Sequence, residues 1–197
     1  MNKTIDYYNQ NAAAYTNSTL EVEFTAVQER FLALLPEGAY ILDFGCGSGR
    51  DTKYFLEKGY HVDAIDGSEE LCTIASRNTG VEVKQCLFED FTAEDETYDG
   101  IWACSSILHL PKETLLTVMK TMVRAVKKGG YIYTSFKYGE FEGERHGRHF
   151  TFFAEDSFRE FAKDIDGVEI VDMWTAADVR PGRGEEMWLN LILKRAI

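Results

Sequence analysis

The chain has 197 residues, of which 45% are hydrophobic, and a formal net charge of −12. This length and composition suit one domain with a single packed core. The negative field would repel a phosphate backbone, so a nucleic acid is an unlikely partner.

The sequence contains no run of about 18 apolar residues, so no membrane-spanning helix is expected. Its first residues, MNKTIDYYNQNAAAY, lack the uninterrupted apolar region of a signal peptide, which favours a cytoplasmic location. The four cysteines (Cys46, Cys72, Cys86 and Cys104) stand far apart without a C-x-x-C pair. They predict reduced thiols and no metal site.

Apolar periodicity and turn residues predict alternating helices and strands along the chain. A helix over 18–35 is expected to begin with a capping box at Ser18 and Glu21. The later expected helices cover 50–59, 68–80, 112–130 and 155–165, and the expected strands cover 39–44, 61–66, 81–88, 98–106, 131–136, 168–176 and 186–195.

Strands that alternate with helices indicate parallel pairing through right-handed crossovers, which predicts a doubly wound α/β sheet. The last two strands are predicted to form a closing antiparallel hairpin across a long loop. No repeat or linker divides the chain, so one domain is expected. Its parts are an N-terminal lid and helix (1–35), a core (38–136) and a substrate-side region (137–197).

The segment ILDFGCGSGRD places a glycine loop directly after a buried strand, between Asp43 and Asp66. Gly45, Gly47 and Gly49 permit unusual backbone angles and let the chain approach a ligand closely. Asp66 ends the next strand, 21 residues after Gly45. That is the position from which a carboxylate can bind both hydroxyls of an adenosine ribose.

The loop spacing and Asp43 favour S-adenosylmethionine over NAD as the adenosine-containing ligand. A dinucleotide loop reads G-x-G-x-x-G and presents a helix N-terminus to a pyrophosphate, whereas this loop reads G-x-G-x-G. A carboxylate at Asp43 would not help to bind a pyrophosphate, but it would favour a ligand that carries a sulfonium and an ammonium group.

Four segments (ILDFGCGSGRD, VDAIDGSEEL, YDGIWACSSILHLP and VKKGGYIYTSF) resemble, in this order, the successive motifs of class I S-adenosylmethionine-dependent methyltransferases. The resemblance is strong over about 38–136. The pair GCGSGRD and GYHVDAIDGS is similar to the tellurite-resistance-type methyltransferase group. The resemblance implies a Rossmann-like seven-stranded sheet, mostly parallel, with the last strand antiparallel.

The resemblance also implies the cofactor site. The methionine end would be lined by Asp43, Gly45, Cys46, Gly47, Gly49, Arg50 and Cys104, the ribose by Asp66, Gly67 and Ser68, and the adenine by Leu87, Phe88 and Glu89. The commoner pattern has an acidic residue at about the position of Leu87. Adenine selection here is therefore expected to rest on Glu89 or on backbone groups.

His109 follows the fourth core strand and is a candidate base or acceptor-orienting residue; a structural role in the next turn is the alternative. Lys137, at the end of the following strand, is grouped with it as catalytic. The segment DYYNQNAAAY resembles a lid that closes over the cofactor, with Tyr8 and Tyr15 facing it. A surface helix is the alternative.

Cationic residues cluster in the last third of the acidic chain. Tyr138, Arg148, Arg180 and Arg183 are predicted to bind the substrate, because arginine's planar fork suits a carboxylate, phosphate or oxyanion. The alternative is that these cations pair with surface carboxylates.

The sequence thus predicts a methyltransferase for a small acceptor that is anionic or bears an oxyanion. A methyltransferase for tRNA or protein and a non-catalytic S-adenosylmethionine-binding module remain as alternatives. The acceptor atom and the oligomeric state are left open by the sequence.

Overall fold

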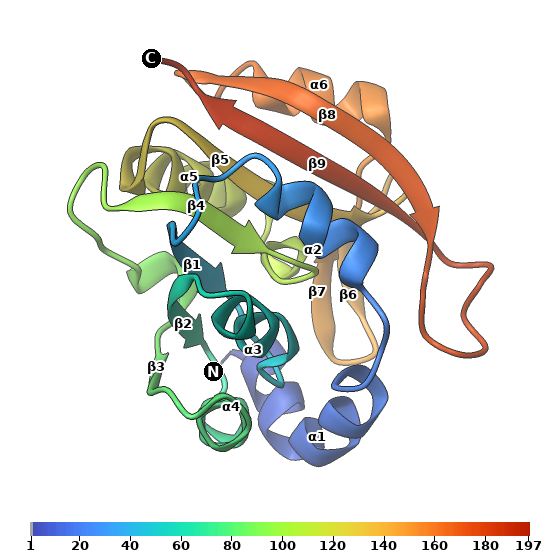
Figure 1. The fold of residues 1–197 in the computed structure, drawn as a ribbon. Coiled ribbons are helices and arrows are strands. Elements are labelled where there is room, and N and C mark those ends of the chain that lie inside the picture. The colour runs from blue at the N-terminus through green and yellow to red at the C-terminus, as the bar shows by residue number, and fades with distance from the viewer. Residues whose placement is uncertain (1) are drawn as a thin grey trace.

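The computed structural model describes residues 2–197, and their elements alternate along the chain (Figure 1). The helices are α1 (Lys3–Thr19), α2 (Thr25–Leu32), α3 (Arg50–Glu57), α4 (Glu69–Thr79), α5 (Lys112–Ala125) and α6 (Glu155–Ala162), with short 3-10 turns η1 (Phe88–Asp90) and η2 (Ile107–His109). The strands are β1 (Tyr40–Phe44), β2 (His61–Asp66), β3 (Val83–Gln85), β4 (Tyr98–Ala103), β5 (Val126–Lys137), β6 (Glu142–Arg145), β7 (Arg148–Thr151), β8 (Val168–Ala177) and β9 (Met187–Arg195).

Seven strands form one sheet in the order β3-β2-β1-β4-β5-β9-β8. The first five are parallel, and the last strand of the chain, β9, lies antiparallel between β5 and β8. This confirms the predicted Rossmann-like α/β fold and its closing hairpin. Within residues 2–197, no helix combines the length and the apolar run that a membrane crossing needs.

Helices cover both faces of the sheet. Phe31 of α2 and Phe55 of α3 pack with Trp102 and Tyr133 on one face, and all four side chains are fully buried. The other face carries a larger cluster that includes residues of α5 and α6. Trp102 is therefore part of the core, as the sequence indicated.

Three expected boundaries are wrong. The helix predicted over 18–35 is split: α1 extends through Ser18, and α2 begins only at Thr25. The Ser18 hydroxyl donates to the carbonyl of Tyr15 and caps nothing. Phe24, with φ of −137°, interrupts the helix, although the apolar face after it does pack on the sheet.

The helix predicted over 112–130 ends at Ala125, and the next five residues begin β5. The glycine pair that follows the lysines disfavours a helix, and Gly129 adopts a φ of +77°. Only 83–85 of the strand predicted over 81–88 pair in the sheet. The β6–β7 hairpin was not predicted at all.

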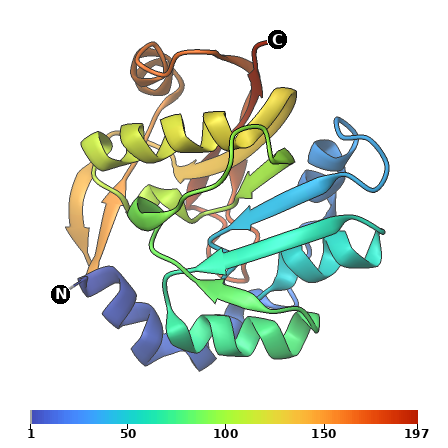
Figure 2. The same ribbon diagram turned by 90° about the vertical axis from the view of Figure 1, so that its left-hand side faces the viewer.

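The carboxyl ends of the parallel strands face α1 and the β6–β7 hairpin (Figure 2). The His149 amide of β7 donates to the Thr4 hydroxyl of α1 at 3.1 Å, and Lys3 of α1 pairs with Glu144 of β6 at 3.0 Å. The edge where a ligand binds in open α/β sheets is thus enclosed by two segments from opposite ends of the sequence.

Candidate active site

The loop after β1 is fixed by its own backbone. The amides of Gly45 and Cys46 both donate to the carbonyl of Ile65 on β2, at 2.9 and 3.0 Å. Gly45 has a φ of +89°, and a Cβ atom there would lie 2.4 Å from the Cβ of Ser106. Only glycine fits this close approach to Ser106. Gly45 also lines both cavities described below.

Asp66 lies at the carboxyl end of β2 and binds the same loop. Its two carboxylate oxygens accept the amides of Gly47 and Ser68, each at 2.9 Å. Burial raises the pKa of Asp66, and these backbone donors oppose the shift. Each oxygen has a further lone pair available for a ligand hydroxyl.

Asp43 lies behind the loop and lines neither of the cavities described below. It is 2% exposed and accepts the hydroxyl of Thr52 at 2.6 Å. Burial, together with the charge of Asp51, raises its pKa to about 8. A nearby positive charge would favour the ionised form of this carboxyl group.

Asp51 holds Arg50 against the loop. Burial alone would raise the pKa of Asp51, but a two-fold hydrogen bond from Arg50 and single bonds from Trp102 and Gln28 hold it below its usual range. The Arg50 guanidinium also stacks on the ring of Phe24 at 4.6 Å. This network was not predicted, although Asp51 lies only two residues after Gly49 of the loop.

Two cavities adjoin at this edge of the sheet. The small cavity has a volume of about 60 Å³ and is bounded by Gly47, Asp66, Gly67, Leu87, Phe88, Glu89 and residues of α1. The large cavity has a volume of about 700 Å³. The two share five residues: Tyr8, Tyr15, Gly45, Ser105 and His109.

His109 and Tyr8 form a hydrogen-bonded pair at the junction. His109 Nδ1 lies 2.7 Å from the carbonyl oxygen of His149, which can only accept, so Nδ1 carries the proton. Nε2 is then an acceptor, and it receives the Tyr8 hydroxyl at 2.8 Å. Burial lowers the pKa of His109 to about 4, so the ring is neutral at pH 7.

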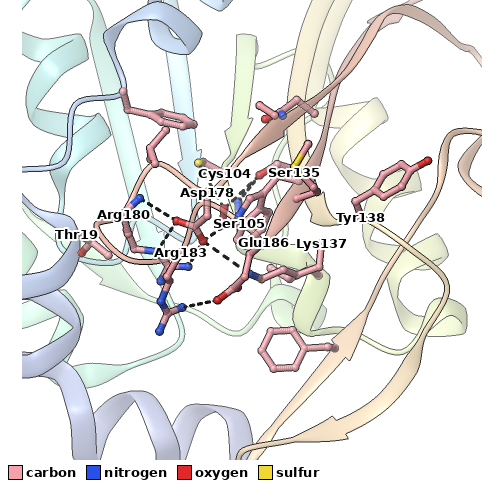
Figure 3. Close-up of a pocket in the computed structure, with 18 of the residues that line it drawn as sticks. Thr19, Cys104, Ser105, Ser135, Lys137, Tyr138, Asp178, Arg180, Arg183 and Glu186 are labelled. Atoms are coloured by element: carbon pink, nitrogen blue, oxygen red, sulfur yellow. Dashed lines mark hydrogen bonds and ion pairs between the residues drawn. The ribbon is translucent and has the colours of Figure 1, made fainter.

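The large cavity brings together most of the predicted catalytic and substrate residues. It is lined by Tyr8, Tyr15, Gly45, Cys46, Arg50, Cys104, His109, Lys137, Tyr138, Arg148, Arg180 and Arg183. Lys137 is not a free amine there, because it pairs with Glu186 and lies 3.7 Å from Asp178, as Figure 3 shows. Asp178, Glu186, Trp188 and Phe150 also line the cavity and were not predicted as site residues.

Two other predicted residues lie outside both cavities. Gly49 packs on α4, where a Cβ atom would meet Thr79 at 2.7 Å. Ser68 is fully buried and caps α4 by accepting the Leu71 amide, while its hydroxyl donates to Asn9 of α1. Across residues 2–197, His, Cys, Asp and Glu side chains nowhere gather in threes that could hold a metal ion.

Comparison with known proteins identifies residues 41–130 as a match to a methyltransferase domain family. The putative methyltransferase YqeM of Bacillus subtilis is 30% identical over 118 residues, 55% of this chain and 48% of that protein. The 18S rRNA (guanine-N(7))-methyltransferase bud23 of Schizosaccharomyces pombe is 30% identical over 141 residues, 64% of this chain and 53% of that protein. The matches thus span about half the length of these relatives.

A solved structure with the same fold is that of 1,6-didemethyltoxoflavin-N1-methyltransferase from Burkholderia thailandensis, with its substrate and S-adenosylhomocysteine bound. It has a TM-score of 0.76 and 22% identity, and the match covers 98% of this chain and 85% of that one. The family match is to a methyltransferase domain, and the structural match shows the same fold. The acceptor differs among the relatives.

Proposed function

We propose that this chain, whose residues 41–130 match a methyltransferase domain, methylates a small anionic acceptor with S-adenosylmethionine. The observation that carries the proposal is the junction of the two cavities at Tyr8 and His109. One cavity contains the glycine loop and Asp66, and the other is large enough for a small molecule and is lined by cations. Pockets for such ligands measure about 300–1,000 Å³.

The residues present fit the cofactor. When bound, S-adenosylmethionine supplies a methyl group on a cationic sulfur. The lone pairs of Asp66 would accept the ribose hydroxyls, and Phe88, Leu87 and Glu89 would flank the adenine. Arg50 and the loop would hold the methionine end, with the Asp43 carboxyl group behind it.

In this proposal α1 acts as the lid. The small cavity is well below the size of a nucleoside site, because the Ile5 side chain packs directly onto Gly67: a Cβ atom at Gly67 would lie 2.5 Å from Ile5 Cδ1. We therefore infer that α1 shifts to admit the cofactor. Only Thr4, Ala12 and Thr16 of this helix are buried, and the shift would break the hydrogen bonds of Tyr8 with His109 and of Asn9 with Ser68.

The lowered pKa of His109 favours an orienting role over that of a general base. A general base works best with a pKa near the working pH, and a pKa of about 4 is too low for that task. We infer that His109 orients the Tyr8 hydroxyl at the junction. An acceptor that is already ionised needs no base, which agrees with an anionic nucleophile. Lys137, held by two carboxylates, contributes charge and position rather than proton transfer.

The motif pair resembling the tellurite-resistance-type group is compatible with an oxyanion acceptor. A non-catalytic cofactor-binding module is disfavoured, because the cavity beyond the cofactor site is open and reaches both His109 and Lys137. The rRNA-modifying relative makes RNA the main competitor, and the net charge of −12 weighs against it.

The test follows S-adenosylhomocysteine release when the purified protein meets cell extract divided into dialysable metabolites, RNA and protein. Turnover is expected only with the metabolite fraction. Within that fraction, the acceptor should be found among the compounds that an anion-exchange resin retains. The Asp66→Ala variant, weakened in cofactor binding, serves as the negative control. Turnover only with RNA or protein would overturn the small-acceptor proposal.

A further inference from the structure

The cations of the large cavity fall into two sets. Those near the β8–β9 loop are neutralised: Arg180 donates to both oxygens of Asp178, at 2.9 and 2.5 Å. Lys137 pairs with Glu186, and Arg183 lies 3.8 Å from the same carboxylate. Figure 3 shows these cations and carboxylates next to one another, joined by dashed lines. This set offers little net positive charge to a ligand.

The cations of the β6–β7 hairpin have aromatic neighbours instead of carboxylates. The Arg148 guanidinium carbon lies 4.2 Å from the ring centre of Tyr7 and 5.0 Å from that of Phe150. Arg145 lies 3.8 Å over Phe141. Among residues 2–197, no carboxylate forms an ion pair with either arginine.

Arg148 is the better placed of the two. It is partly buried, and one of its terminal nitrogens donates weakly to the Tyr8 hydroxyl at 3.4 Å. Its Nε is buried without any hydrogen-bond partner. An unpaired guanidinium between rings keeps its full charge in surroundings of low polarity, where an anion is bound more strongly than in water. Arg145 is exposed and lies nearer the solvent.

The walls beside Arg148 are aromatic. Alternate residues of a strand share one face, and Arg148, Phe150 and Phe152 follow that alternation from β7 onward and all line the large cavity. The Phe150 ring centre lies 4.7 Å from that of His109. A flat ring bound on this face would have its acidic group at Arg148 and its edge towards the junction at Tyr8 and His109.

We propose that Arg148 is the residue that selects the acceptor's anionic group and that the acceptor is an aromatic or heteroaromatic acid. This inference rests on the proposed function for the role of the cavity. Arg180, Arg183 and Lys137 then shape the wall opposite without binding the anion.

The experiment measures binding to the full chain saturated with S-adenosylhomocysteine, by isothermal titration and ligand-observed NMR. The probes are benzoate, nicotinate, the matched neutral amides, cyclohexanecarboxylate and inorganic phosphate. The two aromatic acids are expected to bind more tightly than all the others. Arg148→Gln should weaken their binding roughly tenfold or more and leave the amides unchanged, as expected for loss of a charged hydrogen bond.

Arg183→Gln is the matched control, since it removes an arginine of the same cavity that already has a carboxylate partner. It should change binding less than twofold, and Arg148→Lys should fall between wild type and Arg148→Gln. Unchanged S-adenosylhomocysteine affinity and melting temperature confirm that Arg148→Gln is folded.

Equal losses in the Arg148 and Arg183 variants, or no preference for acids over amides, would overturn the assignment of Arg148. If phosphate or cyclohexanecarboxylate bound with the same affinity as benzoate, the proposal of an aromatic acceptor would be overturned. Because binding needs no turnover, the result is separate from that of the extract assay. If the acids bound in an Arg148-dependent way but only RNA were methylated, the acid-binding site would be supported and the proposed function would be wrong.

Discussion

The glycine loop is held by main-chain hydrogen bonds to the next strand, whereas Arg148 and Lys137 of the large cavity find partners far away in the sequence. The Gly45 amide donates to the carbonyl of Ile65 and the Gly47 amide to the carboxylate of Asp66, both on the next strand. Arg148 instead contacts Tyr8, 140 residues earlier, and Lys137 contacts Glu186, 49 residues later. Under the proposed function, the loop and Asp66 belong to the cofactor half of the site, and the large cavity is its acceptor half.

The largest effect is expected in the acceptor half, at Asp178. Its side chain is 2% exposed and binds Arg180, Lys137 and the Trp188 indole nitrogen, and these donors outweigh burial to hold its pKa well below its usual range. Asp178→Ala leaves Arg180 without a carboxylate partner and Lys137 with Glu186 alone, so the free energy of unfolding should fall by about 3 kcal/mol.

Urea unfolding followed by circular dichroism measures this change. Asp164→Ala, at an exposed position, is the control and should alter stability by less than about 0.5 kcal/mol. If the two variants were equally stable, the ion pairs around Asp178 would not hold this wall of the cavity, and the distinction between paired and unpaired cations would lose its basis.

The matching change in the cofactor half is Asp66→Ala. It removes charge-assisted hydrogen bonds of about 1.5–3 kcal/mol, so S-adenosylmethionine affinity should fall roughly ten- to a hundredfold. Isothermal titration measures the affinity, and Asp95→Ala, an exposed aspartate, is the control. Unchanged affinity in a folded Asp66 variant would contradict its role at the ribose.

The contrast between near and distant partners explains which parts of the fold and of the site could be predicted from the sequence. The alternation of strands and helices, the glycine loop and the position of Asp66 at a strand end follow from local apolar runs, glycines and spacing, so they were predictable. The β6–β7 hairpin was missed because glycines and charges interrupt its alternation. Asp178 was missed because two of its partners, Lys137 and Trp188, reach it only in the folded chain. For the same reason, the sequence could not separate paired arginines from unpaired ones.

At the junction between the halves, His109 should make stability depend on pH. The folded ring takes up a proton only near pH 4, whereas the unfolded chain does so at the ordinary pKa of 6.5. Below pH 6.5 the unfolded state binds more protons, so the free energy of unfolding should decrease as the pH falls from about 6.5 towards 4.

This loss should amount to about 3 kcal/mol more in wild type than in His109→Gln, in which the group does not titrate. The comparison cancels the carboxylates, which titrate in both proteins. Urea unfolding at a series of pH values between 4 and 7.5 gives the difference. Parallel curves for the two proteins would mean that His109 is not held neutral in the folded state.

The smallest effect is expected at Tyr8 of α1, which lines both the small and the large cavity. Tyr8→Phe removes one neutral hydrogen bond to His109, worth about 1 kcal/mol, and the weak one from Arg148, and it keeps the ring. Amides of α1 should then exchange with deuterium roughly fivefold faster, since this bond links the helix to η2. Tyr7→Phe is the matched control, because its ring contacts Arg148 and its hydroxyl has no hydrogen bond among the described residues. Faster exchange in both variants, or in neither, would show that the Tyr8 hydroxyl does not hold the lid.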